Sequence, residues 1–224
     1  MFRRILQNTV RGDVKGNLAN KFRQKRINYF LTLLSTIKKS PITILDIGGT
    51  DYYWLALEVD KEVKMEITLL NPEECTNKNP LFKYVKGDGR DLSLFKENSV
   101  DIVFSNSVIE HVGTWEDQKK FANEVKRVAK RYYVQTPNYY FPFEPHFLII
   151  GIHYLPIRLR AFLIRHFNLG WYNKRKSYSD SLKLAESIRL LKNRELKYLF
   201  PEAIINREKI IGFTKSFLVI YGFG

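Results

Sequence analysis

Short apolar runs alternate with longer amphipathic stretches along most of this chain. Five of the runs are rich in β-branched or aromatic residues, which predicts strands. They lie near residues 42–47, 66–70, 83–85, 100–105 and 131–135. The stretches between them are predicted helices, and one of these begins at Trp115 and runs to about residue 129. Strands that alternate with helices form a parallel sheet covered by helices on both faces.

The end of the chain departs from this alternation. A helix is predicted at about 193–200, with Asn193 as its N-cap, followed by strands near 203–210 and 215–221. The two strands are joined by a short turn, so they are antiparallel to each other. The sequence therefore predicts an α/β fold with a doubly wound, seven-stranded, mostly parallel sheet and one antiparallel strand near its edge.

Two helical segments are predicted outside this sheet. We expect residues 1–40 to form a basic N-terminal helical arm, with a helix at about 17–38, and residues 41–224 to form one domain. Within that domain, residues 138–185 are predicted to be an insertion on the substrate side. Five apolar residues of the insertion recur at helical spacing and predict a basic amphipathic helix. They are Leu155, Leu159, Phe162, Leu163 and Phe167. This stripe suits either a lid packed on the sheet or a surface that takes an amphiphilic acceptor from a membrane.

The first predicted strand ends in an acid and paired glycines. Asp46 lies two residues before Gly48-Gly49, where a tight turn lets the backbone approach a ligand. The stretch lacks the G-x-G-x-x-G spacing of a dinucleotide site. The carboxylate of Asp46 is poorly suited to a pyrophosphate and well suited to a cationic amino-acid ligand.

Several motifs together resemble those of the class I S-adenosylmethionine (SAM)-dependent methyltransferases, in particular the group that methylates small molecules, sugars and lipids. The motifs begin with Asp46-x-Gly48 and end in a helix and strand pair typical of that group. Between them lie Gly87-Asp88, the strand Asp101 to Ser105 followed by Ile109-Glu110-His111-Val112, and Thr136-Pro137-Asn138. The last two are Leu199-Phe200-Pro201-Glu202-Ala203 and Lys215-Ser216-Phe217. The resemblance implies a Rossmann-like fold, SAM as the cofactor and methyl transfer as the reaction.

The resemblance also implies roles for individual residues. Asp46 and the backbone at Gly48 and Gly49 would hold the methionine end of SAM, and Asp88 would accept a hydrogen bond from the adenine amino group. Ser105 and Asn106 would lie beside the cofactor, near the transferable methyl group.

Two positions depart from the family pattern. Thr50 replaces the third glycine, and Asn71 replaces the acid that binds the ribose hydroxyls. An amide loses the charge-assisted hydrogen bonds of a carboxylate, which predicts weaker SAM binding or a ribose contact through Glu73.

Methyl transfer to a hydroxyl needs a group that removes the proton. His111 follows the fourth strand and is one candidate; it could equally pack on the cofactor or cap a helix. Glu144 and His146 follow the fifth strand, in a loop stiffened by prolines, and could pair to activate a hydroxyl. A purely structural role in that loop is the alternative. We predict His111, Glu144 and His146 as the catalytic residues.

Glu110-His111 is similar to the end of a Glu-x-x-Glu-His metal signature found in some related methyltransferases. Here Ser107 stands at the first position, and Thr114 lies three residues after His111. Two ligands do not define a site with a preferred geometry. The sequence therefore predicts no metal.

Composition narrows the class of protein. The chain has 224 residues, is 45% apolar and contains a single cysteine, Cys75, which suits one domain with a full core in a reducing cytoplasm. Its start lacks the apolar stretch of a signal peptide, and no run is long enough to span a bilayer. We expect a cytoplasmic protein with a possible peripheral position at the membrane.

The net charge of +14 is unevenly distributed. Both flanks, residues 1–40 and 141–224, are strongly basic, whereas residues 41–140 are slightly acidic. Such flanks suit an anionic partner, either a membrane surface or nucleic acid, although solvated basic faces explain them as well.

We therefore expect a SAM-dependent methyltransferase that methylates an oxygen of a small-molecule, saccharide or lipid-linked acceptor. An RNA-directed methyltransferase is a less favoured alternative, because no RNA-binding module is recognisable. A non-catalytic module with a degenerate cofactor site is the other alternative, and calorimetry with SAM separates it from the enzymes.

Overall fold

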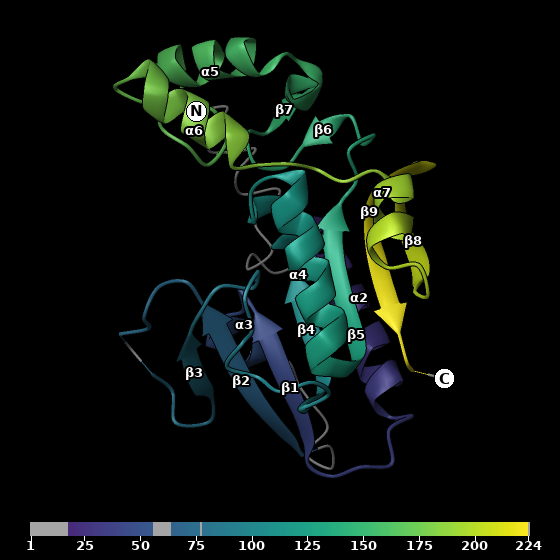
Figure 1. The fold of residues 1–224 in the computed structure, drawn as a ribbon. Helices are drawn as coiled ribbons and strands as arrows, with labels where there is room; N and C mark the ends of the chain where they lie inside the picture. The colour runs from purple at the N-terminus through teal and green to yellow at the C-terminus, as the bar shows by residue number, and fades with distance from the viewer. Residues whose placement is uncertain (1–17, 56–63, 77, 224) are drawn as a thin grey trace.

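The computed structural model describes residues 18–55, 64–76 and 78–223. Within these ranges seven strands form one sheet in the order β3-β2-β1-β4-β5-β9-β8 (Figure 1). Five strands are parallel: β1 (Ile42–Ile47), β2 (Met65–Asn71), β3 (Lys83–Lys86), β4 (Val100–Asn106) and β5 (Ala129–Pro137). β9 (Phe213–Tyr221) is antiparallel to both its neighbours, β5 and the edge strand β8 (Ile204–Ile210). The predicted sheet is confirmed.

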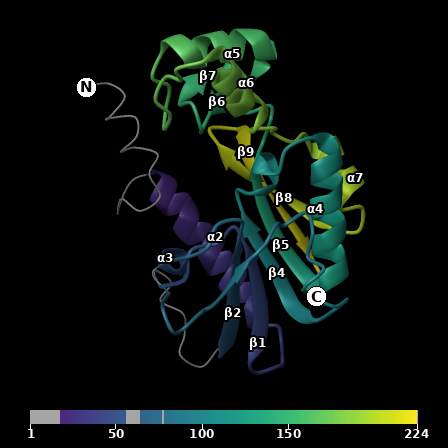
Figure 2. The same ribbon diagram turned by 60° about the vertical axis from the view of Figure 1, so that its left-hand side comes forward.

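Helices cover both faces of the sheet, as Figure 2 shows. α4 (Trp115–Val128) and α7 (Asn193–Leu199) lie on one face, and α2 (Leu18–Leu34) and α3 (Asp51–Leu55) on the other. α4 begins at a capping box, in which Thr114 and Asp117 each accept a hydrogen bond from the other's backbone N–H. α7 begins one residue earlier than predicted: Lys192 is its N-cap, and Asn193 is its first helical residue.

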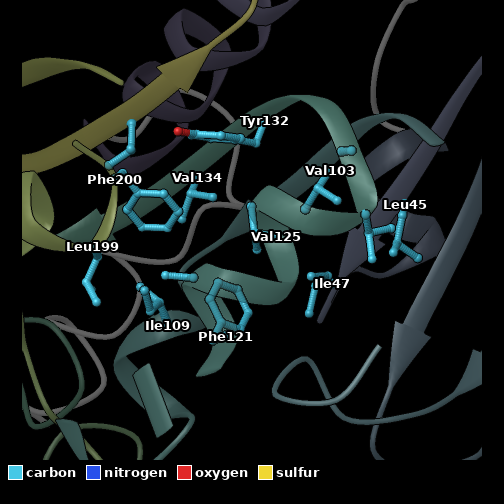
Figure 3. Close-up of a cluster of buried hydrophobic side chains, with 14 of the residues drawn as sticks. Leu45, Ile47, Val103, Ile109, Phe121, Val125, Tyr132, Val134, Leu199 and Phe200 are labelled. Carbon is cyan, nitrogen blue, oxygen red and sulfur yellow. The ribbon is translucent and has the colours of Figure 1, made fainter. Parts of the chain in front are cut away.

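The core on the α4 face is built from the predicted apolar runs (Figure 3). Leu45 and Ile47 of β1 and Val103 of β4 are at most 2% exposed and belong to one cluster with Phe121 and Val125 of α4. Because successive side chains of a strand point to opposite faces, the residues between them pack under α2. The near-continuous apolar character of these strands follows from this burial on both faces.

The helix α2 packs directly on the sheet and is part of the domain. Ile27, Phe30 and Leu34 of α2 are at most 3% exposed, and the Phe30 ring lies 4.9 Å from that of Phe104 and 5.1 Å from that of Tyr133. The helix ends at Leu34, before the predicted residue 38. Residues 1–17 of the expected arm lie outside the described residues.

The inserted segment forms a separate cap beyond the carboxyl ends of the parallel strands (Figures 1 and 2). We call residues 138–191 the lid. It contains the strand pair β6 (Phe143–Glu144) and β7 (Ile149–Ile150), the short helix η2 (Ile152–Tyr154), and the helices α5 (Ile157–His166) and α6 (Tyr178–Glu186). α5 packs on α6 over a core of its own, to which Phe147, Ala161 and Ala185 belong.

The predicted stripe of α5 does not pack on the sheet. The buried residues of α5 are Ala161 and Ile164, which pack within the lid, whereas Leu159, Phe162 and Phe167 are 43%, 49% and 54% exposed. Leu155 and Leu163 of the stripe are partly buried and pack against the same lid core, so the stripe is divided between that core and solvent. The lid interpretation of this stripe, with its apolar side on the sheet, is therefore wrong. Among the described helices none is long and apolar enough to cross a membrane.

Candidate functional site

A small cavity of about 180 Å³ lies at the carboxyl end of β1. Asp46, Gly48 and Gly49 line it, as the sequence predicts for the binding of a cationic amino acid. Gly48 has φ +74°, and a Cβ there would lie 2.5 Å from Cγ2 of Val108. A Cβ on Gly49 would lie 1.7 Å from Oδ2 of Asp46. Both positions therefore require glycine, and the turn brings bare backbone against the cavity.

Asp46 is the charged group at the base of this cavity. It is 1% exposed, and its Oδ2 accepts a hydrogen bond of 2.7 Å from Nε1 of Trp54. Burial raises the pKa of this carboxyl to about 8, and the Trp54 hydrogen bond opposes that rise. The carboxyl of Asp46 would therefore become fully ionised when a cationic group of a ligand binds beside it.

Arg23 of α2 supplies a positive charge to the same cavity. Its guanidinium lies 5.0 Å from the centre of the Tyr53 ring, in a cation–π contact. A carboxylate at the base and a guanidinium at the wall complement the ammonium and carboxylate of an amino acid. Arg23 was not predicted, because it lies on a helix that precedes the sheet and carries no motif.

The other predicted cofactor residues have their own contacts. The side chain of Asn71 donates a 2.8 Å hydrogen bond to the Gly49 carbonyl, which ties the end of β2 to the glycine turn. Asp88 forms an ion pair with Arg90, at 2.5 Å between Oδ2 and a terminal nitrogen, and hydrogen bonds from Arg90 lower the pKa of Asp88. Glu73 is exposed.

At the end of β4 the two predicted residues differ in position. Ser105 is fully buried, donates to the Ile47 carbonyl at 3.4 Å and lines neither cavity. Asn106 lines the small cavity and a second, larger one. Ser107 follows with φ +60°, a backbone conformation that is strained for a residue with a side chain, and it donates to Oε1 of Gln135 at 2.8 Å.

The larger cavity has a volume of about 510 Å³ and lies between the sheet and the lid. Its apolar walls come from Phe22 of α2 and from lid residues, and its three cationic side chains come from α2 and β9. The apolar lid residues include Phe141, Phe143 and Trp171, and the cations are Arg23, Arg26 and Lys215. None of its described lining residues is acidic.

Lys215 has a perturbed pKa. Burial, together with the nearby positive charge of Arg26, lowers this pKa to about 8. Its Nζ lies 4.6 Å from the centre of the Phe22 ring. Arg26 pairs with Glu208 at 3.1 Å, and both are largely buried. An anion that enters the cavity would therefore meet positive charge that is poorly solvated.

A cluster of imidazoles and carboxylates borders the cavity. Oε1 of Glu144 lies 2.5 Å from Nδ1 of His146, and Oε2 accepts the backbone N–H groups of His146 and Phe147. Glu144 is 1% exposed, so it lies behind His146 and fixes its orientation. Nε2 of His146 is left as the ring nitrogen available to other groups. The predicted pairing of Glu144 with His146 is present. The two residues lie at the end of β6 and in the loop that follows it.

His111 meets His146 edge to face, with ring centres 4.6 Å apart. It ends the short helix η1 (Ile109–His111), which follows β4. Although part of the residue is open to solvent, desolvation of the ring, together with the charge of His146, lowers the pKa of His111 to about 4. His111 is therefore a neutral imidazole, whereas the partnership with Glu144 raises the pKa of His146 despite its burial.

Glu110 completes the cluster and was not predicted as a site residue. It is fully buried, and burial raises its pKa to about 7. The Thr136 hydroxyl donates to its Oε2 at 3.0 Å, whereas its Oε1 has no hydrogen-bond partner among the described residues. One ligand atom from each of Glu110, His111 and His146 lies within 4.8 Å of the others. The motif Ile109-Glu110-His111 contains two of the three cluster residues. The sequence alone does not show that His146 lies beside them.

One family model matches a part of the chain that helps to form the small cavity. Residues 48–132, from the glycine turn to β5, match the model of a methyltransferase domain. The match covers the strand ends that form the small cavity. This part of the chain is therefore similar to a methyltransferase domain. The small cavity offers a carboxyl group and a guanidinium, which suit the ammonium and carboxylate groups of an amino-acid ligand.

Solved structures share the fold of this chain at low sequence identity. The DszA carbon methyltransferase is similar over 92% of this chain and 55% of its own, with 16% identity and a TM-score of 0.60. The carbon methyltransferase (CMeT) domain of citrinin polyketide synthase is similar over 89% and 51%, with 10% identity and a TM-score of 0.56. The CurJ carbon methyltransferase is similar over 90% of this chain and 54% of its own, with 12% identity and a TM-score of 0.54.

The chain thus spans about half the length of those three chains. No protein with a curated description matches its sequence.

Proposed function

We propose that this chain is a SAM-dependent methyltransferase that methylates an oxygen of a small-molecule, saccharide or lipid-linked acceptor with an acidic group. The larger cavity is the observation that carries this proposal. It adjoins the small cavity through Arg23 and Asn106, it has aromatic walls, and its charged side chains are cationic. A volume of about 510 Å³ suits an acceptor of one or two rings or the head of a larger amphiphile.

In this proposal the small cavity binds the methionine end of SAM. Asp46 pairs with its ammonium group, Arg23 with its carboxylate, and Gly48 and Gly49 leave room for the ligand. SAM supplies a methyl group on a positively charged sulfur, which needs positioning more than activation. Asn71 and Asp88, at the ends of β2 and β3, would face the ribose and the adenine.

The acidic group of the acceptor would lie near Lys215 and Arg26. An anion beside Lys215 favours the charged amine and offsets the burial that now lowers its pKa. The aromatic walls would pack on the body of the acceptor. In this proposal the acceptor hydroxyl would lie near Asn106 and His146, which both line the cavity.

Transfer to a hydroxyl releases a proton, and the cluster beside Asn106 would receive it. His146 is the member that lines the cavity, with Glu144 as the positioning residue that fixes its ring. His111 packs on the other side of His146 and restricts its movement.

The outer face of the lid supports delivery of the acceptor from an anionic membrane. Leu159, Phe162 and Phe167 are exposed beside the exposed cations Arg158 and Arg165. Apolar side chains that insert at the interface and cations near the head groups both favour such binding. Arg160 contributes little here, because it donates to the Ala185 carbonyl at 3.3 Å inside the lid.

Methyl-labelled SAM and paired acceptors test the proposal. Each pair consists of a hydroxylated aromatic carboxylate or phosphate and the same alcohol without the acid. We expect labelled ether products, with kcat/KM at least tenfold higher for the acidic member in each pair. Lys215→Met should abolish this preference, whereas the matched change Lys209→Met on exposed β8 should preserve it.

Mass spectrometry of the products decides between oxygen and carbon as the methylated atom. A new carbon–carbon bond would refute the proposed oxygen acceptor and align the chain with the carbon methyltransferases that share its fold. SAM binding without any transfer to either member of a pair would refute the proposed acceptor class. A lack of SAM binding would leave the non-catalytic alternative.

A further inference from the structure

The cluster formed by η1 and the loop after β6 has the composition of a metal site. Glu110, His111 and His146 offer one carboxylate oxygen and two imidazole nitrogens, with the ligand atoms within 4.8 Å of one another. Three atoms about 2.1 Å from a shared ion lie at most about 4.2 Å apart, so small side-chain rotations bring them into range. The three residues come from two elements that only the folded chain brings together, η1 and the loop after β6.

One oxygen of the Glu110 carboxylate has no hydrogen-bond partner among the described residues. Glu110 is 0% exposed, and its Oε2 accepts from Thr136, but its Oε1 has no hydrogen-bond partner in the described part of the chain. A buried carboxylate oxygen left unpaired has lost its hydration without a compensating hydrogen bond, which is unfavourable. A cation held between Glu110 and the two imidazoles removes this penalty.

The groups behind the three residues resemble the outer shell of a metal site. Glu144 binds Nδ1 of His146 at 2.5 Å and is itself fixed by two backbone N–H groups. The backbone of Ser187 hydrogen-bonds the ring of His111. A carboxylate or carbonyl on the far nitrogen of a metal-binding histidine orients the ring and raises its basicity as a ligand.

We propose that Glu110, His111 and His146 bind one divalent transition-metal ion at the edge of the acceptor cavity. Two imidazoles and one carboxylate suit ions such as Zn²⁺ and Mn²⁺ better than Ca²⁺. With three protein ligands the ion keeps open positions, and His146 lines the cavity from which a hydroxyl would approach. The ion would supply Lewis acidity that lowers the pKa of a bound hydroxyl.

The proposed site differs from the sequence-based expectation of no metal. That expectation considered only the adjacent pair Glu110 and His111, without a third ligand. The site also deepens the proposed function, since the ion and the acceptor hydroxyl would meet at one point. The binding itself does not depend on SAM or on the acceptor. The competing occupant of the site is a proton, which would make His146 an imidazolium between Glu110 and Glu144.

Metal analysis and calorimetry test the site on the full chain. After dialysis against a chelator, ZnCl2 and MnCl2 are titrated in separate runs without SAM. We expect one ion per chain, and Co²⁺ loaded in the same way should show an absorption spectrum of mixed nitrogen and oxygen coordination. His111→Gln, His146→Gln and Glu110→Gln should each weaken binding at least 100-fold, and Glu144→Gln about 10- to 100-fold.

His166→Gln is the matched control. His166 lies on exposed α5, and its Nδ1 contacts only the Phe162 carbonyl among the contacts of the described residues, so binding should be unchanged. SAM calorimetry on each variant verifies that it is folded. Binding of none of these ions by the wild-type chain, or equal binding by the His111→Gln and His146→Gln variants, would overturn the proposal. Ion binding by a chain that fails to bind SAM would refute the proposed function and leave this inference standing.

Discussion

Replacement of Asp46 by Asn should stabilise the fold and weaken SAM binding at the same time. The carboxyl group is 1% exposed, and burial raises its pKa from 3.8 to about 8. The unfolded chain releases this proton near pH 4, whereas the folded protein retains it up to about pH 8. The contribution of protonated Asp46 to the free energy of unfolding is therefore fully present below pH 4. It decreases by about 1.4 kcal/mol per pH unit as the pH rises towards 8.

At pH 7 this loss amounts to about 4 kcal/mol. Asn has nearly the same volume, cannot ionise, and can accept the 2.7 Å hydrogen bond from Trp54. We therefore expect Asp46→Asn to raise the free energy of unfolding by up to about 4 kcal/mol at pH 7, and by about 2 kcal/mol at pH 5. Urea denaturation at both pH values measures the difference.

SAM binding should respond in the opposite direction. Pairing of the SAM ammonium with Asp46 expels the proton, so calorimetry in two buffers of different ionisation enthalpy should show release of nearly one proton at pH 6.5 and about half at pH 8. Asp46→Asn should bind SAM at least tenfold more weakly, by about 1.4 kcal/mol, and release none. Equal affinity, or a stability gain independent of pH, would refute the reasoning.

Asp101 is the matched control on the neighbouring strand. It is 4% exposed, and although burial raises its pKa, hydrogen bonds from Lys39 and Thr43 lower it below its usual value. The sign is thus reversed, and Asp101→Asn should destabilise the fold at pH 7 without an effect on SAM affinity.

The remaining predictions concern the acceptor side. His146→Gln should lower turnover about 100-fold or more and leave the SAM dissociation constant within about twofold, as measured by single-turnover kinetics and calorimetry; full activity would exclude His146 from the reaction. Gly49→Ala should abolish SAM binding in calorimetry, because the new Cβ would displace Asp46; unchanged affinity would contradict that geometry. The wild-type chain should cosediment with anionic but not zwitterionic vesicles, and Arg158→Glu with Arg165→Glu should reduce binding about tenfold or more. Equal binding to duplex RNA, with none to vesicles, would favour nucleic acid instead.

The sheet could be predicted because its strands are buried on both faces. The largely apolar runs at 42–47 and 100–104 are typical of strands buried on both faces, and their alternation with helices predicts a parallel sheet. The direction of α5 could not be predicted in this way. Apolar residues lie on more than one side of it, and only the packing of Ala161 against α6 decides which side is buried.

The site was predictable to the extent that strand ends reveal it. Asp46, Gly48 and Asn106 lie at the ends of β1 and β4, and the carboxyl ends of parallel strands meet at one edge. The cations of the larger cavity were hidden, because Arg26 and Lys215 belong to elements that lie far apart in the chain. The unpaired oxygen of Glu110 is a property of packing that no pattern of residues expresses.

The two ends of the lid lie side by side at the edge of the sheet, and this makes the segment between them exchangeable. Asn138 bridges to Leu191, and the Tyr139 N–H donates to the Leu191 carbonyl at 3.0 Å, so the segment leaves and returns through adjacent backbone. Its core is formed by its own residues. A graft between positions 138 and 191 could therefore replace Trp171, His146 and the aromatic walls as one cassette. The glycine turn and Asp46 would be untouched, so such chimaeras could acquire new acceptors while retaining their methyl donor.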